Sequence, residues 1–241
     1  MEPSAPPLAD PPATAATQAG AWQGTAGPVS STETLPPLGC PPNAPVGFGL
    51  IHPLASILDR LDQTRLFRQP QPLEVELGSG DGSFLLQHAL RHPDRNFIGV
   101  ERLLGRLRKL DRKGGRAGLT NLLLVRIEAG YFLEYLLPPA TAQALHIYFP
   151  DPWPKKRHRK HRLVNERFPD IARQALVPGG IVYLRTDDAD YFTQMRAVFG
   201  ANAAFQETET PAALTELVTD FERHFQAQGV AIRHAAYQRT S

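Results

Sequence analysis

Cysteine is nearly absent from this chain of 241 residues, and the single one, Cys40, lies in a proline-rich stretch. One cysteine excludes an internal disulfide and a cysteine-based metal site, and it is typical of a reducing compartment. No run of about 18 apolar residues is present, and the start has neither the basic nor the apolar region of a secretory signal. We therefore expect a cytoplasmic protein that does not contact a membrane.

Basic residues are missing from the first part of the chain, because no lysine or arginine precedes Arg60. The whole sequence has 26 basic and 24 acidic residues, so the remainder is distinctly basic, which suggests an anionic partner. Residues 1–45 are rich in proline and alanine and poor in large apolar residues, so they cannot offset the entropy of ordering. The sequence predicts a disordered tail over residues 1–45 and one folded domain over residues 46–241, as a monomer or a homodimer.

Strand-like and helix-like segments alternate after the tail. Short apolar runs predict strands over residues 73–77, 96–100, 122–127, 144–149, 181–185, 205–208 and 232–237. Helices are expected over residues 83–91 (with Ser83 as N-cap), 103–116, 131–137, 164–176, 190–200 and 219–228. This alternation of apolar strands with helices predicts an α/β fold with a doubly wound, mostly parallel sheet.

Acidic residues follow three of the predicted strands. The first strand leads into a glycine turn, Glu76–Gly82, and glycines there let the backbone approach a ligand closely. Glu101 ends the second strand about 20 residues later, where an acidic residue can bind both ribose hydroxyls. Glu128 follows the third strand, where a carboxylate can accept from an exocyclic amine. This pattern favours S-adenosylmethionine over a phosphate-bearing nicotinamide cofactor; a structural turn and a helix-start glutamate are the simpler interpretations.

A stiff, basic segment, Phe149–Arg162, follows the fourth strand. Three prolines in five residues hold Asp151 at the edge of the cofactor pocket, and Trp153 offers a face on which an unstacked base can stack. All residues of Lys155–Arg162 are Lys, Arg or His, so they can neutralise several phosphates. No metal site is expected, because neither a cysteine nor a helical i, i+4 pair supports the histidines of this run. The segment predicts nucleic-acid contact, with a solvated surface as the alternative.

Taken together, these motifs resemble those of bacterial tRNA (guanine-N7-)-methyltransferases. The matching segments are Glu76–Gly82, Gly99-Val100-Glu101, Phe149–Arg162, Thr186-Asp187 and Thr219–Glu222, and the resemblance covers about residues 47–228. It implies a Rossmann-like class I methyltransferase fold with late antiparallel strands. It also implies S-adenosyl-L-methionine as the cofactor and methylation of guanine N7 at variable-loop position 46 of tRNA, with no metal.

The resemblance also implies roles for individual residues. The cofactor-binding residues would be Glu76, Gly78, Gly80, Glu101, Glu128 and Asp151, and Asp151 would also be the catalytic residue. The residues that contact the tRNA or its guanine would be Lys155, Asp187, Thr219, Asp220, Phe221 and Glu222. Two positions depart from the family: Glu128 stands where Asp is usual, and Ser79 where a bulky residue is common. From spacing alone, Thr219 and Glu222 form a helix capping box, and this role is compatible with substrate contact.

Three alternatives remain at this point. The first is a methyltransferase that acts on an exocyclic amine of a base, since Asp151-Pro152-Trp153 loosely resembles the loops of such enzymes. The second is a non-catalytic RNA-binding module with a degenerate cofactor site, which the set Glu76, Glu101 and Asp151 disfavours. The third is a nicotinamide oxidoreductase, for which a basic segment beside the pocket has no use.

Overall fold

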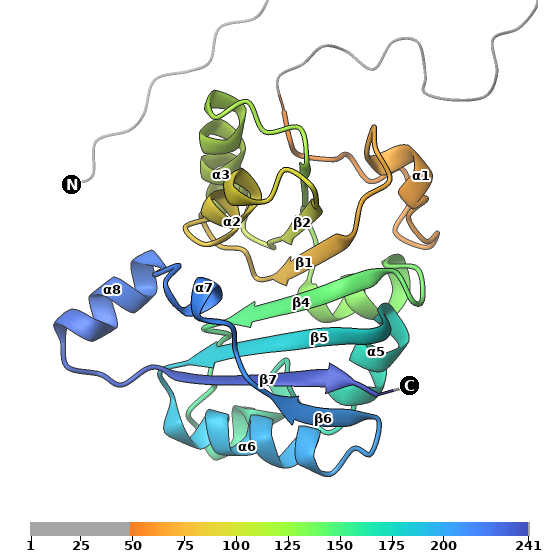
Figure 1. Ribbon diagram of the computed structural model, residues 1–241. Coiled ribbons are helices and arrows are strands. Elements are labelled where there is room, and N and C mark those ends of the chain that lie inside the picture. The colour runs from red at the N-terminus through yellow and green to blue at the C-terminus, as the bar shows by residue number, and fades with distance from the viewer. Residues whose placement is uncertain (1–48, 241) are drawn as a thin grey trace, which may run out of the picture. The chain divides into compact units, whose positions relative to one another are not determined.

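The computed structural model describes residues 49–240, which form one seven-stranded sheet of order β3-β2-β1-β4-β5-β7-β6 (Figure 1). Neighbours among β1 to β5 pair in parallel, and β7 is antiparallel to both β5 and β6. The strands are β1 (Leu73–Leu77), β2 (Asn96–Val100), β3 (Leu122–Val125), β4 (Ala142–Tyr148), β5 (Leu176–Thr186), β6 (Phe205–Thr208) and β7 (Arg233–Arg239). The prediction of a doubly wound, mostly parallel sheet with late antiparallel strands is confirmed.

Helices cover both faces of the sheet. The helices are α1 (Gln63–Leu66), α2 (Leu85–Arg91), α3 (Leu104–Arg116), α4 (Ala129–Tyr131), the π-helical turn η1 (Phe132–Leu136), the 3-10 helix η2 (Lys156–His161), α5 (Phe168–Ala175), α6 (Ala189–Gly200), α7 (Ala212–Thr215) and α8 (Asp220–Ala227). One apolar cluster joins the sheet to η1, α5 and α6, and a second joins it to α2, α3 and α7. None of the described helices has the length and apolar character needed to cross a bilayer.

Strand β1 shows how the sheet places polar groups. Val75 and Leu77 pack in the cluster on the α5 and α6 face. Side chains alternate along a strand, so Glu74 and Glu76 point to the opposite face, which α2 covers. The strand order reverses between β1 and β4, so the carboxyl end of β1 lies at the switch point where such sheets bind ligands.

Most predicted elements are present, with shifted ends. The helix expected from Ser83 begins at Leu85, and the N-cap prediction is wrong, because the Ser83 hydroxyl instead accepts from the backbone N–H of Asp220 at 3.2 Å. The helix expected from Val164 begins at Phe168, since Tyr191 and Gln194 hold both backbone polar groups of Val164. The predicted tail over residues 1–45, with Cys40, lies outside the described residues, so it stays a prediction, as does the 46–241 domain boundary.

Candidate active site

A cleft opens at the carboxyl ends of β1, β2, β3 and β4. Its larger part, here called the first chamber, has a volume of about 390 Å³ and is lined by Gly78, Glu101, Glu128, Phe149 and Asp151 among others. The chain therefore brings together residues from four separate strand ends, as the sequence predicts for a ligand pocket. Figure 1 shows that α7 and α8 lie beside the carboxyl ends of β4 and β5. Residues of the α8 segment, Thr219, Phe221 and Phe225, line the second part of the cleft.

The glycine turn after β1 forms an open edge of this cleft. Gly78 and Gly80 have φ values of 86° and 56°, in the left-handed region that glycine adopts without strain. A Cβ atom on either residue would meet no atom within 4 Å, so the turn faces free space. Gly82 differs, because a Cβ there would collide with Leu110 of α3. Two of the three glycines thus leave room for a ligand, and the third serves packing.

Glu101 links the ends of β1 and β2. Its buried carboxylate accepts from the backbone N–H of Gly80 at 3.1 Å and from that of Leu103 at 2.7 Å. The glycine turn is thereby tied to the start of α3. Each carboxylate oxygen keeps a further lone pair for a donor in the first chamber.

Glu128 also lines the first chamber, but its carboxylate is engaged at a helix start. It caps α4 by accepting from the backbone N–H groups of Gly130 and Tyr131 at 2.9 and 2.7 Å. The side chain lies in an exposed position, in contrast to Glu101. Glu128 is therefore a helix cap whose remaining lone pairs border the cleft.

Glu76 is the most deeply buried carboxyl of the cleft. It is 4% exposed, and its Oε2 atom has no hydrogen-bond partner among the described residues. Burial raises the pKa of Glu76 to about 8, against the charge of Arg185, and the carboxylates of Glu101 and Asp81 add to the rise. A buried polar atom without a partner is rare and costly in a native protein. A ligand that brings a cation or hydrogen-bond donors to this point would supply what the protein lacks.

Asp151 lies in the wall shared by both chambers of the cleft. Its carboxylate is exposed and makes no hydrogen bond within the described part of the chain. The loop that carries it has two non-glycine residues in the left-handed region, Phe149 at φ 50° and Trp153 at φ 44°. Such conformations cost free energy and are concentrated at functional sites. The loop thus holds an uncommitted carboxylate at the mouth of the cleft.

Arg162 anchors this loop from its far end. The guanidinium donates to the Pro152 carbonyl, to Gln194 Oε1 and to Asp190 Oδ2, each at 2.7 Å, and lies over the Tyr191 ring. The side chain is 1% exposed. The prediction that the whole run Lys155–Arg162 is available to phosphates is therefore wrong at Arg162, which positions the Asp151 loop instead.

The rest of the basic run is presented to solvent. Lys155, Lys156, Arg157 and Lys160 are exposed, whereas Arg159 pairs with Asp190 at 3.1 Å. Trp153 is 37% exposed, and its ring contacts those of two histidines of the run, with centroids 5.9 and 5.3 Å apart. An aromatic face beside exposed cations is a surface suited to single-stranded nucleic acid.

The second chamber, of about 290 Å³, adjoins the first across Asp151. It contains three of the six predicted substrate residues, since Asp187, Thr219 and Phe221 line it together with Glu76. Phe221 is 49% exposed and stacks on Phe149, with ring centroids 6.4 Å apart. Lys155, Asp220 and Glu222 lie outside both chambers. The second chamber therefore has an aromatic mouth and an acidic floor.

Thr219 and Glu222 form the capping box expected from their spacing. Thr219 Oγ1 accepts from the Glu222 backbone N–H at 3.0 Å, and Glu222 Oε2 accepts in return from the Thr219 N–H. Glu222 is 2% exposed and pairs with Arg185 at 3.0 Å. Its carboxylate is thus turned inward, while Phe221 and Asp220 beside it face solvent.

Arg185 is a residue of this site that the sequence analysis missed. Besides its ion pair with Glu222, it donates to the backbone carbonyls of Leu217 and Leu214 and lies 4.3 Å from the centre of the Tyr148 ring. It therefore fixes the α7–α8 segment on the end of β5. Nothing local to Arg185 in the sequence indicates these partners, which lie about thirty residues away.

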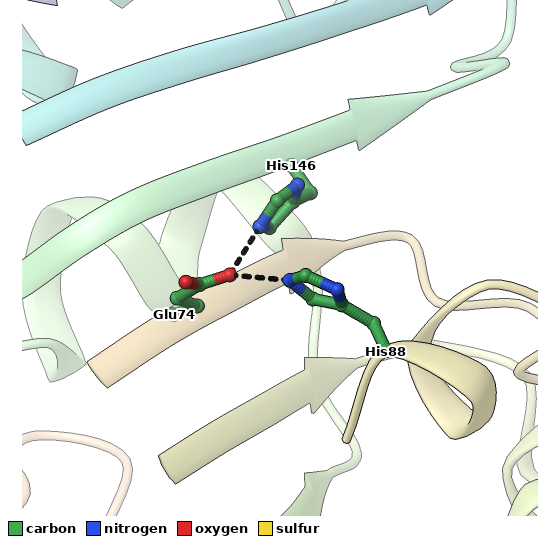
Figure 2. A group of neighbouring side chains, drawn as sticks. All are labelled: Glu74, His88 and His146. Carbon is green, nitrogen blue, oxygen red and sulfur yellow. Dashed lines mark hydrogen bonds and ion pairs between the residues drawn. The ribbon is translucent and has the colours of Figure 1, made fainter. Parts of the chain in front are cut away.

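A second buried polar group lies further back on the same face of the sheet (Figure 2). Glu74 Oε2 is 2.8 Å from His88 Nε2 and 2.9 Å from His146 Nε2, and the Arg95 guanidinium donates to the other oxygen. His146 Nδ1 is in turn 2.9 Å from the hydroxyl of Tyr148, whose ring lines both chambers. The three ligand-type atoms lie within 4.8 Å of one another, as a metal site would need.

The contacts of this cluster favour a hydrogen-bond network. Both imidazoles point an Nε2 atom at one carboxylate oxygen, as two N–H donors do, and Arg95 already neutralises Glu74. A divalent ion added there would place two further buried positive charges beside that guanidinium, which is costly. The network instead supports Tyr148 from behind the cleft floor.

Comparisons with known proteins agree with this arrangement. Residues 70–235 match the family model described as "Putative methyltransferase". The chain is 34% identical over 196 residues to a tRNA (guanine-N(7)-)-methyltransferase of Halorhodospira halophila, covering 79% of this chain and 84% of the relative. It is 35% identical over 188 residues to the enzyme of that name from Syntrophotalea carbinolica, covering 76% and 81%.

Solved structures share the fold at lower identity. A 30S ribosomal A1408 methyltransferase from an uncultured bacterium superposes with a TM-score of 0.52 at 17% sequence identity, over 72% of this chain and 89% of that one. A likeness at this identity concerns the fold alone. The family model and the relatives above carry the assignment: this chain belongs to the tRNA (guanine-N(7)-)-methyltransferase family.

Proposed function

We propose that this protein transfers a methyl group from S-adenosyl-L-methionine to N7 of a guanine in tRNA, at variable-loop position 46. The observation that carries the proposal is the two-chamber cleft: Asp151 lies in the wall that both chambers share, the buried carboxyl of Glu76 lines the second chamber, and exposed cations follow Asp151 in the chain. The names of the family relatives supply the substrate class. Modification of tRNA in this way would take place in the cytoplasm.

The donor groups of the cleft fit S-adenosyl-L-methionine. Gly78 and Gly80 leave backbone space open, and the lone pairs of Glu101 are suited to ribose hydroxyls, with Glu128 at the adenine end. Glu76 has the unpartnered oxygen that a positively charged ligand would satisfy. The chambers hold no cluster of cations for a pyrophosphate, since Arg102 and Arg106 are the only Arg or Lys side chains lining them.

The chemistry requires positioning more than proton transfer. Guanine N7 has an in-plane lone pair and no proton, so the attack needs no general base. When bound, S-adenosyl-L-methionine supplies the electrophilic methyl group. The protein aligns the two reactants, which can provide much of the rate acceleration of a displacement reaction. The modified guanine is cationic, and the free carboxylate of Asp151 would stabilise that growing charge.

The tRNA contacts follow the rim of the cleft. Lys155 and its exposed neighbours are placed to neutralise phosphates, and Phe221 offers a face on which the target guanine can stack. Asp187 in the second chamber can accept from the guanine edge. For Thr219, Asp220 and Glu222 the proposed role is to present Phe221, because Thr219 and Glu222 are engaged in the capping box.

Nucleoside analysis of an unmodified tRNA transcript tests the reaction. After incubation with the full chain and labelled S-adenosyl-L-methionine, we expect the label in N7-methylguanosine at position 46. Label in an N-methylated exocyclic amine would instead indicate a methyltransferase that acts on the exocyclic amine of a base. No label despite cofactor binding would refute the proposal.

Asp151→Asn tests the assignment of the catalytic residue. The variant keeps the size of the side chain and removes its charge, so we expect a large loss of turnover with little change in tRNA affinity. Single-turnover methyl transfer and tRNA binding, measured on the same protein, separate the two effects. Loss of tRNA binding with normal turnover of bound tRNA would show that Asp151 has a different role.

A further inference from the structure

Helix α3 carries a strong positive charge that the proposed reaction does not use. Between Leu104 and Arg116 it has six Lys or Arg residues and one acidic residue, Asp111. Leu107, Leu110 and Gly114 are buried against the domain, so the opposite side of the helix faces solvent. Five of the cations are exposed there: Arg106, Arg108, Lys109, Arg112 and Arg116.

These five cations have no ion-pair partner within residues 49–240. The one acidic residue of the helix, Asp111, accepts from the Leu50 backbone N–H at 2.6 Å. The sixth cation, Lys113, pairs with Asp81 at 3.2 Å. Some exposed arginines on other elements do have partners, as Arg167 pairs with Glu134 at 2.9 Å. The exposed cations of the basic run, Lys155, Lys156, Arg157 and Lys160, also have no ion-pair partner among the described residues, so α3 shares this feature with the run that is expected to meet nucleic acid.

The pattern of charge is locally unfavourable to the helix. Arg108 and Arg112, like Arg112 and Arg116, are four residues apart, a spacing at which like charges repel. Arg106 is in the first turn, where the helix dipole disfavours a cation and no acidic residue compensates it. A solvated surface that served only solubility would be expected to mix both signs. An anionic partner would offset these repulsions.

The position of α3 points to the nature of that partner. Arg102, which precedes the helix, and Arg106, in its first turn, line the first chamber. Trp153 and His161 line it from the segment Phe149–Arg162, here called the basic loop. The helix continues from Arg106 to Arg116 for about 15 Å at its rise per residue, which is long enough to follow several phosphates. Basic residues of both α3 and the basic loop thus border the cleft.

We propose that the exposed face of α3, defined by Lys109, Arg112 and Arg116, is a second phosphate-binding surface for the tRNA. This inference rests on the proposed function, in which the target guanine enters the cleft between α3 and the basic loop. The basic loop holds the nucleotides next to the target, and α3 holds a neighbouring stretch of the backbone. Recognition here is by charge and carries no sequence preference.

The test compares two variants of equal charge. In the first, Lys109, Arg112 and Arg116 are all replaced by Gln; in the second, the matched control, Arg65, Arg68 and Arg196 are replaced by Gln. The control residues are exposed and lie outside both chambers. Binding of an unmodified tRNA transcript to each full-length protein is measured by fluorescence anisotropy at several salt concentrations. Cofactor affinity and methyl transfer at saturating tRNA are measured in parallel.

For the α3 variant we expect the slope of log K against log salt to become shallower by about 2, since each phosphate contact contributes roughly 0.7 to 0.9. Affinity for tRNA should fall about tenfold or more at physiological salt, with unchanged cofactor affinity and an unchanged rate at saturation. The control should change the slope by less than about 0.5. An unchanged slope in the α3 variant, or equal changes in both variants, would overturn the proposal. Because binding is measured without turnover, failure to form N7-methylguanosine would refute the proposed reaction separately.

Discussion

Glu74 and Glu76 lie two residues apart on β1, on the same face of the sheet, and both are almost fully buried. Glu74 contacts His88, His146 and Arg95, whereas Glu76 Oε2 has no partner among the described residues. Burial alone would raise the pKa of Glu74, but the hydrogen bonds from His146 and His88 outweigh it and hold that pKa far below its usual value. For Glu76 burial dominates and raises the pKa to about 8.

The two environments differ in whether the protein itself supplies hydrogen-bond partners for a buried carboxyl. Glu74 is near the amino end of β1, where α2, β4 and the residue before β2 each bring a partner toward it. Glu76 is near the carboxyl end of β1, at the edge of the sheet that opens into the second chamber. A carboxyl that stays unpaired at that edge costs stability, which is expected of a binding group and not of a structural one.

The largest expected effect concerns the stability that Glu74 provides. We expect Glu74→Gln to lower the free energy of unfolding by about 3 kcal/mol, because it leaves Arg95 without a counter-ion and turns one of the two acceptor oxygens into an amide group that faces a donor. Urea unfolding at pH 7 measures this, and Glu76→Gln, on the same strand and face, is the matched control. The control should unfold at no lower urea concentration, and an equal loss in both variants would erase the distinction between the two carboxyls.

The second effect is the loss of cofactor affinity at Glu76. We expect Glu76→Gln to weaken binding of S-adenosyl-L-methionine about 30-fold, which corresponds to about 2 kcal/mol for a hydrogen bond to a charged group. Isothermal titration calorimetry measures it, with Glu74→Gln at a temperature where it is folded as the control. That control should bind within about threefold of wild type. Equal affinity of Glu76→Gln and wild type would show that Glu76 does not contact the cofactor.

The third effect is a pH dependence that belongs to Glu76 alone. Because its pKa is raised to about 8 and a cationic ligand needs the ionised form, cofactor affinity should rise about tenfold between about pH 7 and pH 9. The free protein should show the opposite trend: relative to Glu76→Gln, it loses unfolding free energy as the pH rises from the ordinary glutamate pKa toward 8. Parallel pH profiles for wild type and Glu76→Gln would contradict this assignment.

The smallest effect concerns Glu128, whose carboxylate is exposed and already holds two backbone N–H groups. Aspartate is also a good N-cap, so Glu128→Asp should keep α4 and change cofactor affinity by less than about threefold. The same calorimetric titration measures this. A loss as large as that of Glu76→Gln would mean that the adenine end of the cleft contributes as much to cofactor binding as Glu76 does.

Sequence patterns predicted the parts of the molecule that depend on local periodicity. The strands at residues 73–77 and 96–100 were expected with the bounds that the structure has, since apolar runs define them. The capping box of Thr219 and Glu222 was likewise readable from its spacing. Residues at strand ends line one cleft because parallel strands bring their carboxyl ends to the same edge.

Long-range side-chain partners could not be predicted in this way. Glu74 and His146 are 72 residues apart in sequence, and their contact depends on the register of β1 against β4. Arg162 belongs to a basic run, and only the packing of the run against α6 shows that it is buried while Lys155 is exposed. The partners of Arg185 come from α7 and α8, whose placement follows from the completed sheet.

Methyl transfer to a tRNA transcript in which every guanosine is replaced by 7-deazaguanosine tests the central claim most directly. This transcript keeps the Watson–Crick edge of guanine and lacks the N7 nucleophile. The account predicts that the protein binds it about as well as the normal transcript, methylates the normal one, and transfers no methyl group to the 7-deaza form. Methylation of both transcripts at similar rates would contradict it, because the acceptor would then be an atom other than N7.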